Sequence, residues 1–242
     1  MDELDQLPFE ELQALAEAAR EAKNCRRVLA KTGDTILTEL LRNAGPPKEW
    51  RHYPPGDVYD AEHHAQYYYH CHAAAERRPG EHGHFHTFLR PLGMPAGVRP
   101  APLPDAQAPM GENDALSHLI GVSVDAGGAV TRLFTTNRWV TGETWYVAAD
   151  VAAMLDCFII DHARPSWPLN RWITAVLRLF RQQIVDLLRR RDAALAAAAQ
   201  LGANPFEDRG LEVPSEIDVD CDEFIQQVER AWRAARRRVD GR

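Results

Sequence analysis

The chain divides into three segments according to the spacing of its hydrophobic residues. From residue 8 to about residue 44, apolar side chains recur every three or four positions, which is the spacing of helices that bury one face. Pro8 suits the first turn of one helix, Asp34 can cap a second helix, and Gly45-Pro46-Pro47 would end it. This N-terminal segment therefore predicts two helices.

The C-terminal segment, residues 150–242, returns to the helical spacing. Asp150 can cap a short helix, and the apolar residues between 166 and 200 predict one long helix ahead of Gly202. A short extended stretch follows over residues 211–219. Asp220 or Asp222 is expected to cap a last helix.

Residues 50–148 show the alternation of polar and apolar side chains that is typical of β-strands. Asp125-Ala126-Gly127-Gly128, between two β-branched runs, indicates a hairpin. The order of helices, strands and helices predicts a single α+β domain over residues 1–242. We expect a twisted antiparallel β-sheet of about four to six strands, flanked by N-terminal helices within 1–45 and C-terminal helices within 150–242. The expected strands span residues 66–72, 82–90, 118–124, 129–136 and 144–147.

A proline-rich loop separates the second and third of these strands. Residues 91–113 contain six prolines, so this segment can form neither a helix nor a central strand. Loops of this length are either lids over a functional site or disordered. The sequence leaves both roles open.

Composition limits the partners and the compartment. The 242 residues carry a net charge of -7, which gives no reason to expect a nucleic acid or a membrane as a partner. The acidic start lacks the apolar stretch of a signal peptide, and the four cysteines lie far apart without a CxxC pair, which suits a reducing compartment. We therefore expect a cytoplasmic protein that acts on or binds a small molecule, with its oligomeric state left open. The chain has no HExxH, GxGxxG, GxxxxGK[ST] or GxSxG motif, so zincins, dinucleotide enzymes, nucleotide kinases and serine hydrolases are not indicated.

Histidine supplies the candidate chemistry. Seven of the ten histidines lie between Glu62 and His86, most of them in the runs 67–72 and 81–88, where they alternate with other residues. Alternation with period two places such side chains on one face of a strand. Neutral imidazole is the commonest protein ligand for transition metals, so the two runs together predict a metal site on a β-hairpin.

The pairing register decides whether such a site exists. In an antiparallel hairpin the numbers of opposed residues have a constant sum, and an even sum such as 154 places His70 opposite His84 and His72 opposite His82. An odd sum would turn His70 and His72 away from His84 and His86, because a slip of one residue moves each side chain to the other face. We predict the even register, with His70, His72, His84 and His86 as the metal ligands.

A ligand set dominated by nitrogen suits iron, zinc, copper or nickel rather than magnesium or calcium. Glu76 and Glu81 are the candidate catalytic residues, as proton carriers, although either could instead be a ligand or a hydrogen-bond partner of an imidazole. His64, His82 and His118 could also join the site.

Three functions fit these features. The first is a metalloenzyme acting on a small molecule, with the metal as Lewis acid or oxygen activator. It would show an open coordination position beneath the proline-rich loop. The second is a non-catalytic metal-handling protein, with a closed or loosely exposed site. The third is a small-molecule binding module without metal, whose imidazoles would lie too far apart to share an ion.

One stretch resembles a known motif. His70-Cys71-His72, Glu76 and Gly83 have the spacing of the middle of the first cupin motif, in which two histidines and a glutamate hold a metal inside a small β-barrel. The resemblance implies ligand roles for His70, His72 and Glu76, and it covers about 20 residues. His64 stands where the motif has a glycine, Asp114 stands where the second cupin motif has a histidine, and the long helices depart from a plain cupin.

Overall fold

The computed structural model describes residues 3–103, 109–202 and 204–240. Its centre is a six-stranded antiparallel sheet in the order β1-β2-β3-β4-β5-β6, so each strand pairs with its neighbours in the sequence. The strands are β1 (Tyr53–Tyr59), β2 (Ala65–His70), β3 (Gly83–Leu89), β4 (Ser117–Val124), β5 (Val130–Thr135) and β6 (Ser215–Asp218). The helices are α1 (Phe9–Ala30), α2 (Ile36–Leu41), α3 (Arg138–Thr141), α4 (Ala148–Met154), α5 (Trp167–Leu179), α6 (Arg181–Ala199) and α7 (Cys221–Asp240), with short 3₁₀ turns η1 (Glu3–Gln6), η2 (Pro91–Gly93), η3 (Leu155–Cys157) and η4 (Pro205–Glu207).

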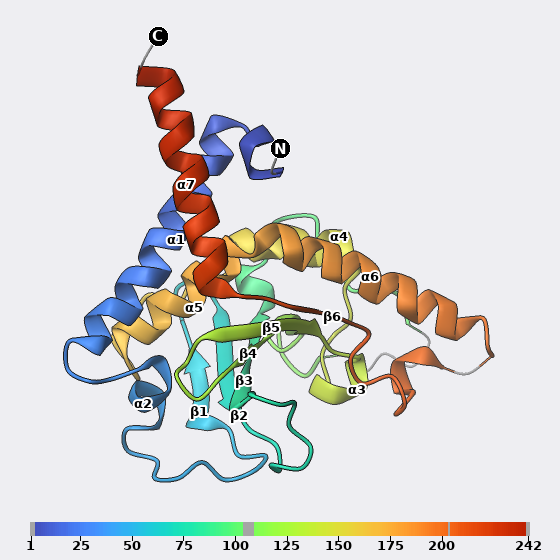
Figure 1. Cartoon of the computed structure of the whole chain (residues 1–242). Coiled ribbons are helices and arrows are strands. Elements are labelled where there is room, and N and C mark those ends of the chain that lie inside the picture. Colours follow the sequence, from blue (N-terminus) through green and yellow to red (C-terminus); the bar gives the residue numbers. More distant parts are fainter. Residues whose placement is uncertain (1–2, 104–108, 203, 241–242) are drawn as a thin grey trace.

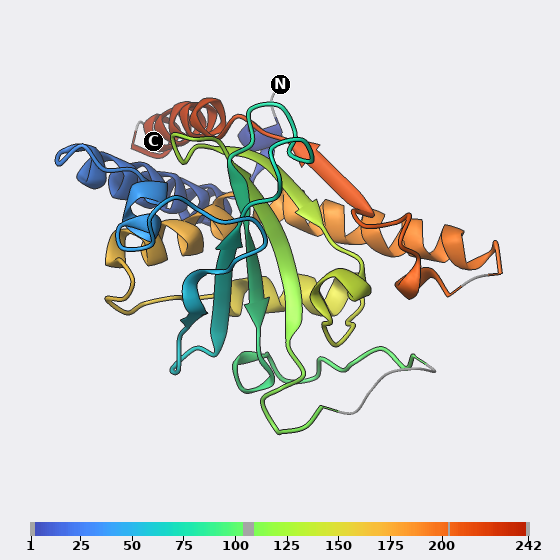
Figure 2. The ribbon, with the colours of Figure 1, turned by 90° about the horizontal axis from the view of Figure 1, so that it is seen from below.

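The predicted α+β class is confirmed, because an antiparallel sheet is flanked by helices from both ends of the chain. The long helices α1, α5, α6 and α7 lie on one side of the sheet (Figure 1). Seen from below, the strands lie in front of these helices (Figure 2). In the described part of the chain no helix is both long enough and apolar enough to cross a membrane.

Side-chain alternation gives the sheet two different faces. Tyr67 and Phe85 point to the helices: Tyr67 Oη donates to Asn170 Oδ1 at 2.6 Å, and the Phe85 ring lies 5.6 Å from that of Trp172. The residues that alternate with them along β2 and β3, which include His70, His84 and His86, therefore face away from the helices. We call this second side the histidine face.

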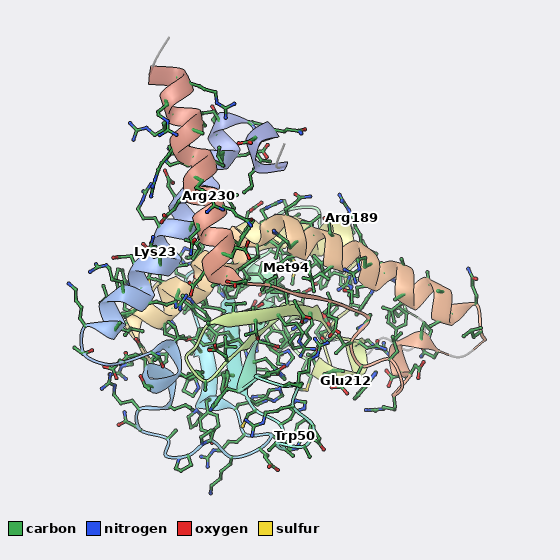
Figure 3. All side chains as sticks on the ribbon, in the orientation of Figure 1. Lys23, Trp50, Met94, Arg189, Glu212 and Arg230 are labelled. Carbon is green, nitrogen blue, oxygen red and sulfur yellow. The ribbon has the colours of Figure 1, made fainter. Side chains whose placement is uncertain are left out.

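The segment before β1 covers part of the histidine face. The backbone N–H of Trp50 donates to the carbonyl of Cys71 at 3.0 Å, which ties this segment to the end of β2. Figure 3 shows Trp50 on the side of the sheet away from α1, α6 and α7.

The observed strands differ from the sequence prediction at β1, at β6 and at residues 144–147. β1 contains Pro54 and Pro55, which conceal it in the sequence, and it is an edge strand, where a missing N–H is tolerated. β6 occupies four residues of the expected extended stretch 211–219. Residues 144–147 are not a strand: Thr144 donates to Leu116 and Ala101 donates to Trp145, but no strand ladder forms, and the carbonyl of Val147 accepts from the first turn of α4.

The predicted single helix over residues 166–200 is wrong, because the chain breaks between α5 and α6 at Phe180 (φ -100°, ψ 18°). A straight helix of that length would extend for about 50 Å, and the break keeps both halves against the core. The predicted caps also shift. Thr35 rather than Asp34 caps α2, and α4 begins before Asp150 because the N–H of Ala148 donates to Asp192. Asp220 does cap α7, accepting from the N–H of Glu223 at 2.9 Å.

Gly121 in β4 leaves room for the ring of Phe134, because a Cβ at position 121 would overlap that ring. The Phe134 ring in turn lies 5.1 Å from His84 and 5.8 Å from His86. We predict that Gly121→Ala lowers the free energy of unfolding by about 1–3 kcal/mol, the usual cost of overpacking, as measured by urea denaturation.

Gly127→Ala is the matched control. It lies in an exposed turn, where the nearest atom to the new Cβ is Asp125 Oδ1 at 3.3 Å. Its free energy of unfolding should stay within about 0.5 kcal/mol of wild type. Equal losses in the two variants would contradict the packing described for Gly121.

Candidate metal centre

The pairing of β2 with β3 has the even register. His70 lies opposite His84 and Tyr68 lies opposite His86, so the predicted sum of 154 is confirmed. On the next strand, His118 lies opposite Phe88. The ladder therefore brings imidazoles from three strands to the histidine face.

Three of these imidazoles are close enough to share an ion. Ligand nitrogens of His70, His72 and His84 all lie within 4.8 Å of one another. The ring centres are 4.5 Å apart for His70 and His84, and 5.0 Å apart for each pair that includes His72. Two imidazoles bound to one zinc ion at a tetrahedral angle have ring centres about 5 Å apart. The side chains present thus fit a transition-metal ion.

A carboxylate orients one of these rings. Glu81 Oε1 lies 2.8 Å from Nδ1 of His84, and Glu81 Oε2 accepts from Nη2 of Arg132 at 3.2 Å. Burial raises the pKa of Glu81, but its hydrogen bond to His84 and the charges of His84 and Arg132 outweigh this and keep the pKa below its ordinary value. An ionised Glu81 accepts the Nδ1 proton of His84, which leaves His84 Nε2 unprotonated and free to bind a metal.

Burial keeps the clustered imidazoles neutral. It is the main cause that lowers the pKa of His70 to about 2, with further repulsion from His84 and His72. Burial likewise lowers the pKa of His84 and of His86. Because a metal binds the unprotonated nitrogen, these groups need no deprotonation at neutral pH.

His70 Nε2 and His84 Nε2 lie 2.7 Å apart. This distance fits a hydrogen bond in which His70 donates its proton to His84. Two nitrogens on one tetrahedral ion, each 2.0–2.1 Å from it, lie about 3.3 Å apart. Metal binding therefore requires the two rings to part slightly and the proton of His70 to move to its Nδ1.

His86, the fourth predicted ligand, lies beside this group. Its ring centre is 5.1 Å from that of His70 and 5.0 Å from that of His84, but its nitrogens are not among those within 4.8 Å. Nδ1 of His86 lies 3.0 Å from Nε2 of His118, and Nδ1 of His118 lies 3.1 Å from Thr136 Oγ1. His118 therefore supports His86 from the adjacent strand, and a ligand role for His86 stays a prediction.

The remaining candidates lie elsewhere. The predicted opposition of His72 and His82 is wrong, because β2 ends at His70 and His82 Nδ1 lies 2.5 Å from Oη of Tyr69, which faces the helices. His64 contacts Tyr59 Oη at the opposite end of β2. Glu76, also the ligand implied by the cupin resemblance, is exposed in the loop between β2 and β3 and lies outside the close group, so its catalytic role stays a prediction. The linear order of the six strands also differs from a cupin barrel.

Sequence reasoning missed three residues around the centre. The His52 ring stacks on Tyr68 at 3.6 Å, and the Trp50 ring lies 4.1 Å from that of His72. Both precede β1, whose two prolines conceal the strand that places them. Arg132, which holds Glu81, alternates with Phe134 along β5, and this period-two pattern could have revealed its face.

Comparison with known proteins locates the chain in one family. A family model described as "Domain of unknown function (DUF6969)" matches residues 16–219. No curated protein and no solved structure matches the chain significantly. The matched span contains all six strands and every histidine of the candidate centre.

Glu143, which contacts the backbone of His118, is a buried acid with a raised pKa. Burial raises the pKa of Glu143 to about 7, and Arg191 and the N–H of His118, which donates to Glu143 Oε2 at 2.8 Å, only partly oppose it. A pKa above that of the unfolded chain means that Glu143 favours folding below about pH 4.5, and that this contribution is lost as pH rises to 7.

Glu143→Gln stays neutral and keeps an oxygen for His118. Between pH 4.5 and 8, we expect the free energy of unfolding of Glu143→Gln to fall by up to about 3 kcal/mol less than that of wild type.

Urea denaturation at a series of pH values measures this difference. The exposed Glu112→Gln is the control, and its profile should follow wild type. A Glu143→Gln profile parallel to wild type would show that the carboxyl does not titrate in this range.

Proposed function

The chain belongs to the DUF6969 family, and we propose that it is a metalloprotein in which His70, His72 and His84 hold one transition-metal ion and present it to a small molecule. The observation that carries this proposal is the gathering of three imidazole nitrogens within 4.8 Å, one of them on a ring that Glu81 orients. Three neutral nitrogen donors suit zinc, iron, copper or nickel.

The donor number favours an enzyme. Three protein ligands leave at least one coordination position for water or a small molecule, as in catalytic zinc sites. A metal bound here would act as a Lewis acid or activate an oxygen ligand. Glu81 would support the site from behind, because it hydrogen-bonds to His84 and so positions that imidazole. Arg132 in turn donates to Glu81 and holds the carboxylate in place.

The small molecule approaches from the side of His72 and Trp50. The side chains of His70 and His84 are buried, whereas His72 is half-buried and Trp50 is 58% exposed. The expected approach beneath the proline-rich loop is not favoured, because this loop leaves β3 after Leu89, about 17 Å along the strand from His84. Residues 104–108 of that loop lie outside the described residues.

The two alternative functions are a metal-free binding module, which is disfavoured, and a metal-handling protein, which one observation favours. A metal-free binding module would place the imidazoles too far apart to share an ion, and the 4.8 Å grouping disfavours it. A metal-handling protein with an exchangeable ion is favoured by one observation, the partial exposure of His72. Catalytic turnover of a small molecule separates this function from the enzyme.

We predict that the chelator-treated, untagged protein binds one Zn²⁺ per chain, and that His70→Ala and His84→Ala each weaken binding at least 100-fold, because each removes one of three donors. Isothermal titration calorimetry measures both stoichiometry and affinity. The control is His63→Ala, since His63 contacts Asp60 and lies outside the close group. Failure of the wild type to bind zinc, iron, copper or nickel would refute the proposal, as would equal affinity in all variants.

Glu81→Gln should weaken zinc binding by about 10–100-fold, the usual effect of losing a carboxylate behind a metal-bound imidazole. Its side chain keeps its size but loses the charge that accepts the proton of His84. The exposed Glu76→Gln is the matched control and should bind zinc as wild type does. The reverse ranking would contradict the role of Glu81 and favour Glu76 as a ligand, which is the role that the cupin resemblance implies.

A further inference from the structure

A further imidazole lies over the histidine face, on a segment outside the hairpin. His52 immediately precedes β1, and its ring stacks on Tyr68 with centres 3.6 Å apart and planes 8° from parallel. The ring centre lies 6.0 Å from that of His70.

His52 makes its hydrogen-bond contact through Nδ1, and this contact orients the ring. Nδ1 lies 3.0 Å from Oδ1 of Asp57, and Oδ2 of Asp57 accepts from Nε2 of Gln66 at 2.8 Å. Gln66, Tyr68 and His70 follow one another along the histidine face of β2. Asp57 therefore holds Nδ1 at the Gln66 end of this row, and Nε2 makes no hydrogen bond with the residues that the structure describes.

This arrangement repeats the one at His84. In both cases a carboxylate oxygen lies within hydrogen-bond distance of Nδ1, that of Glu81 for His84 and that of Asp57 for His52. Imidazoles that bind metals are commonly oriented by a carboxylate in this way.

We propose that His52 is a fourth, exchangeable nitrogen ligand of the centre, which binds the ion held by His70, His72 and His84 and gives way to an incoming small molecule. This inference rests on the proposed function. The nitrogens of His52 lie outside the close group, and its ring centre is about 1 Å farther from that of His70 than the spacing of two ligands on one ion, so the ring must move toward the centre to bind. Sliding along the face of Tyr68 allows this movement, and the side chain is 44% exposed.

The test uses Co²⁺, whose visible absorption is stronger in four-coordinate sites than in sites with more ligands. The full-length protein is loaded with Co²⁺ as wild type, His52→Ala and Asp57→Asn, and affinity is measured by competition with a chelator. We expect His52→Ala to lose most of the visible absorption and about 10-fold in affinity. Asp57→Asn should fall between His52→Ala and wild type, and His63→Ala should match wild type.

Two further readouts separate a ligand from a structural residue. Free imidazole added to His52→Ala should restore the wild-type spectrum, because it fills the vacated position. Azide should bind the Co²⁺-loaded His52→Ala more tightly than wild type, because no side chain competes with it. A lost spectrum that imidazole does not restore would overturn the ligand role in favour of a structural one.

The outcomes also separate this inference from the proposed function. If wild type and His52→Ala bind Co²⁺ with the same affinity and spectrum, His52 is not a ligand, while the centre of three histidines stands. If wild type binds no metal, the proposed function itself fails, and this inference fails with it.

Discussion

The two faces of β2 and β3 constrain each other. Tyr67 and Phe85 are fully buried against the helices, so the residues that alternate with them, His70 and His84, must point the other way. Burying each large side chain contributes about 2 kcal/mol, and a slip of one residue would forfeit this for every side chain of the pair. Apolar packing on the helical face therefore fixes the register that brings the imidazoles together.

Burial of so many polar groups on the histidine face depends on their partners. Glu81 bonds His84 and Arg132, and Arg132 also donates to Ser123 Oγ at 3.1 Å and to Glu216 at 2.7 Å. A buried polar group without a partner costs about 1–3 kcal/mol, so this network is what allows β3, β4 and β5 to carry such residues. The same network holds the ring of His84 in one orientation, which preorganises the centre.

The sequence predicts the hairpin part of the centre well because alternation is a local signal. Alternation in the runs around His70 and His84 indicates which side chains share a face within each strand. The pairing register then decides whether the two histidines lie on the same face of the sheet. The position of His52 is not a local signal: it depends on β1, whose Pro54 and Pro55 predict a loop although an edge strand tolerates them. Among the acids, spacing alone could not separate Glu81, which turns back to His84, from the exposed Glu76.

The breaks and caps of the helices likewise depend on contacts that are distant in the sequence. Apolar residues recur without interruption through Phe180, so the periodicity predicts one helix where the chain forms two, α5 and α6. The cap of α4 comes from Asp192, 44 residues away, and no neighbouring residue indicates it. Period and turn chemistry thus predict the existence of elements, while their ends and breaks depend on tertiary contacts.

The most direct test of a shared ion is X-ray absorption spectroscopy at the zinc edge of the zinc-loaded protein. The account predicts three or four nitrogen neighbours at about 2.0 Å, together with the outer-shell scattering of imidazole rings. A first shell of oxygen alone, without imidazole scattering, would contradict it, because zinc would then be bound at carboxylates and water rather than between β2 and β3.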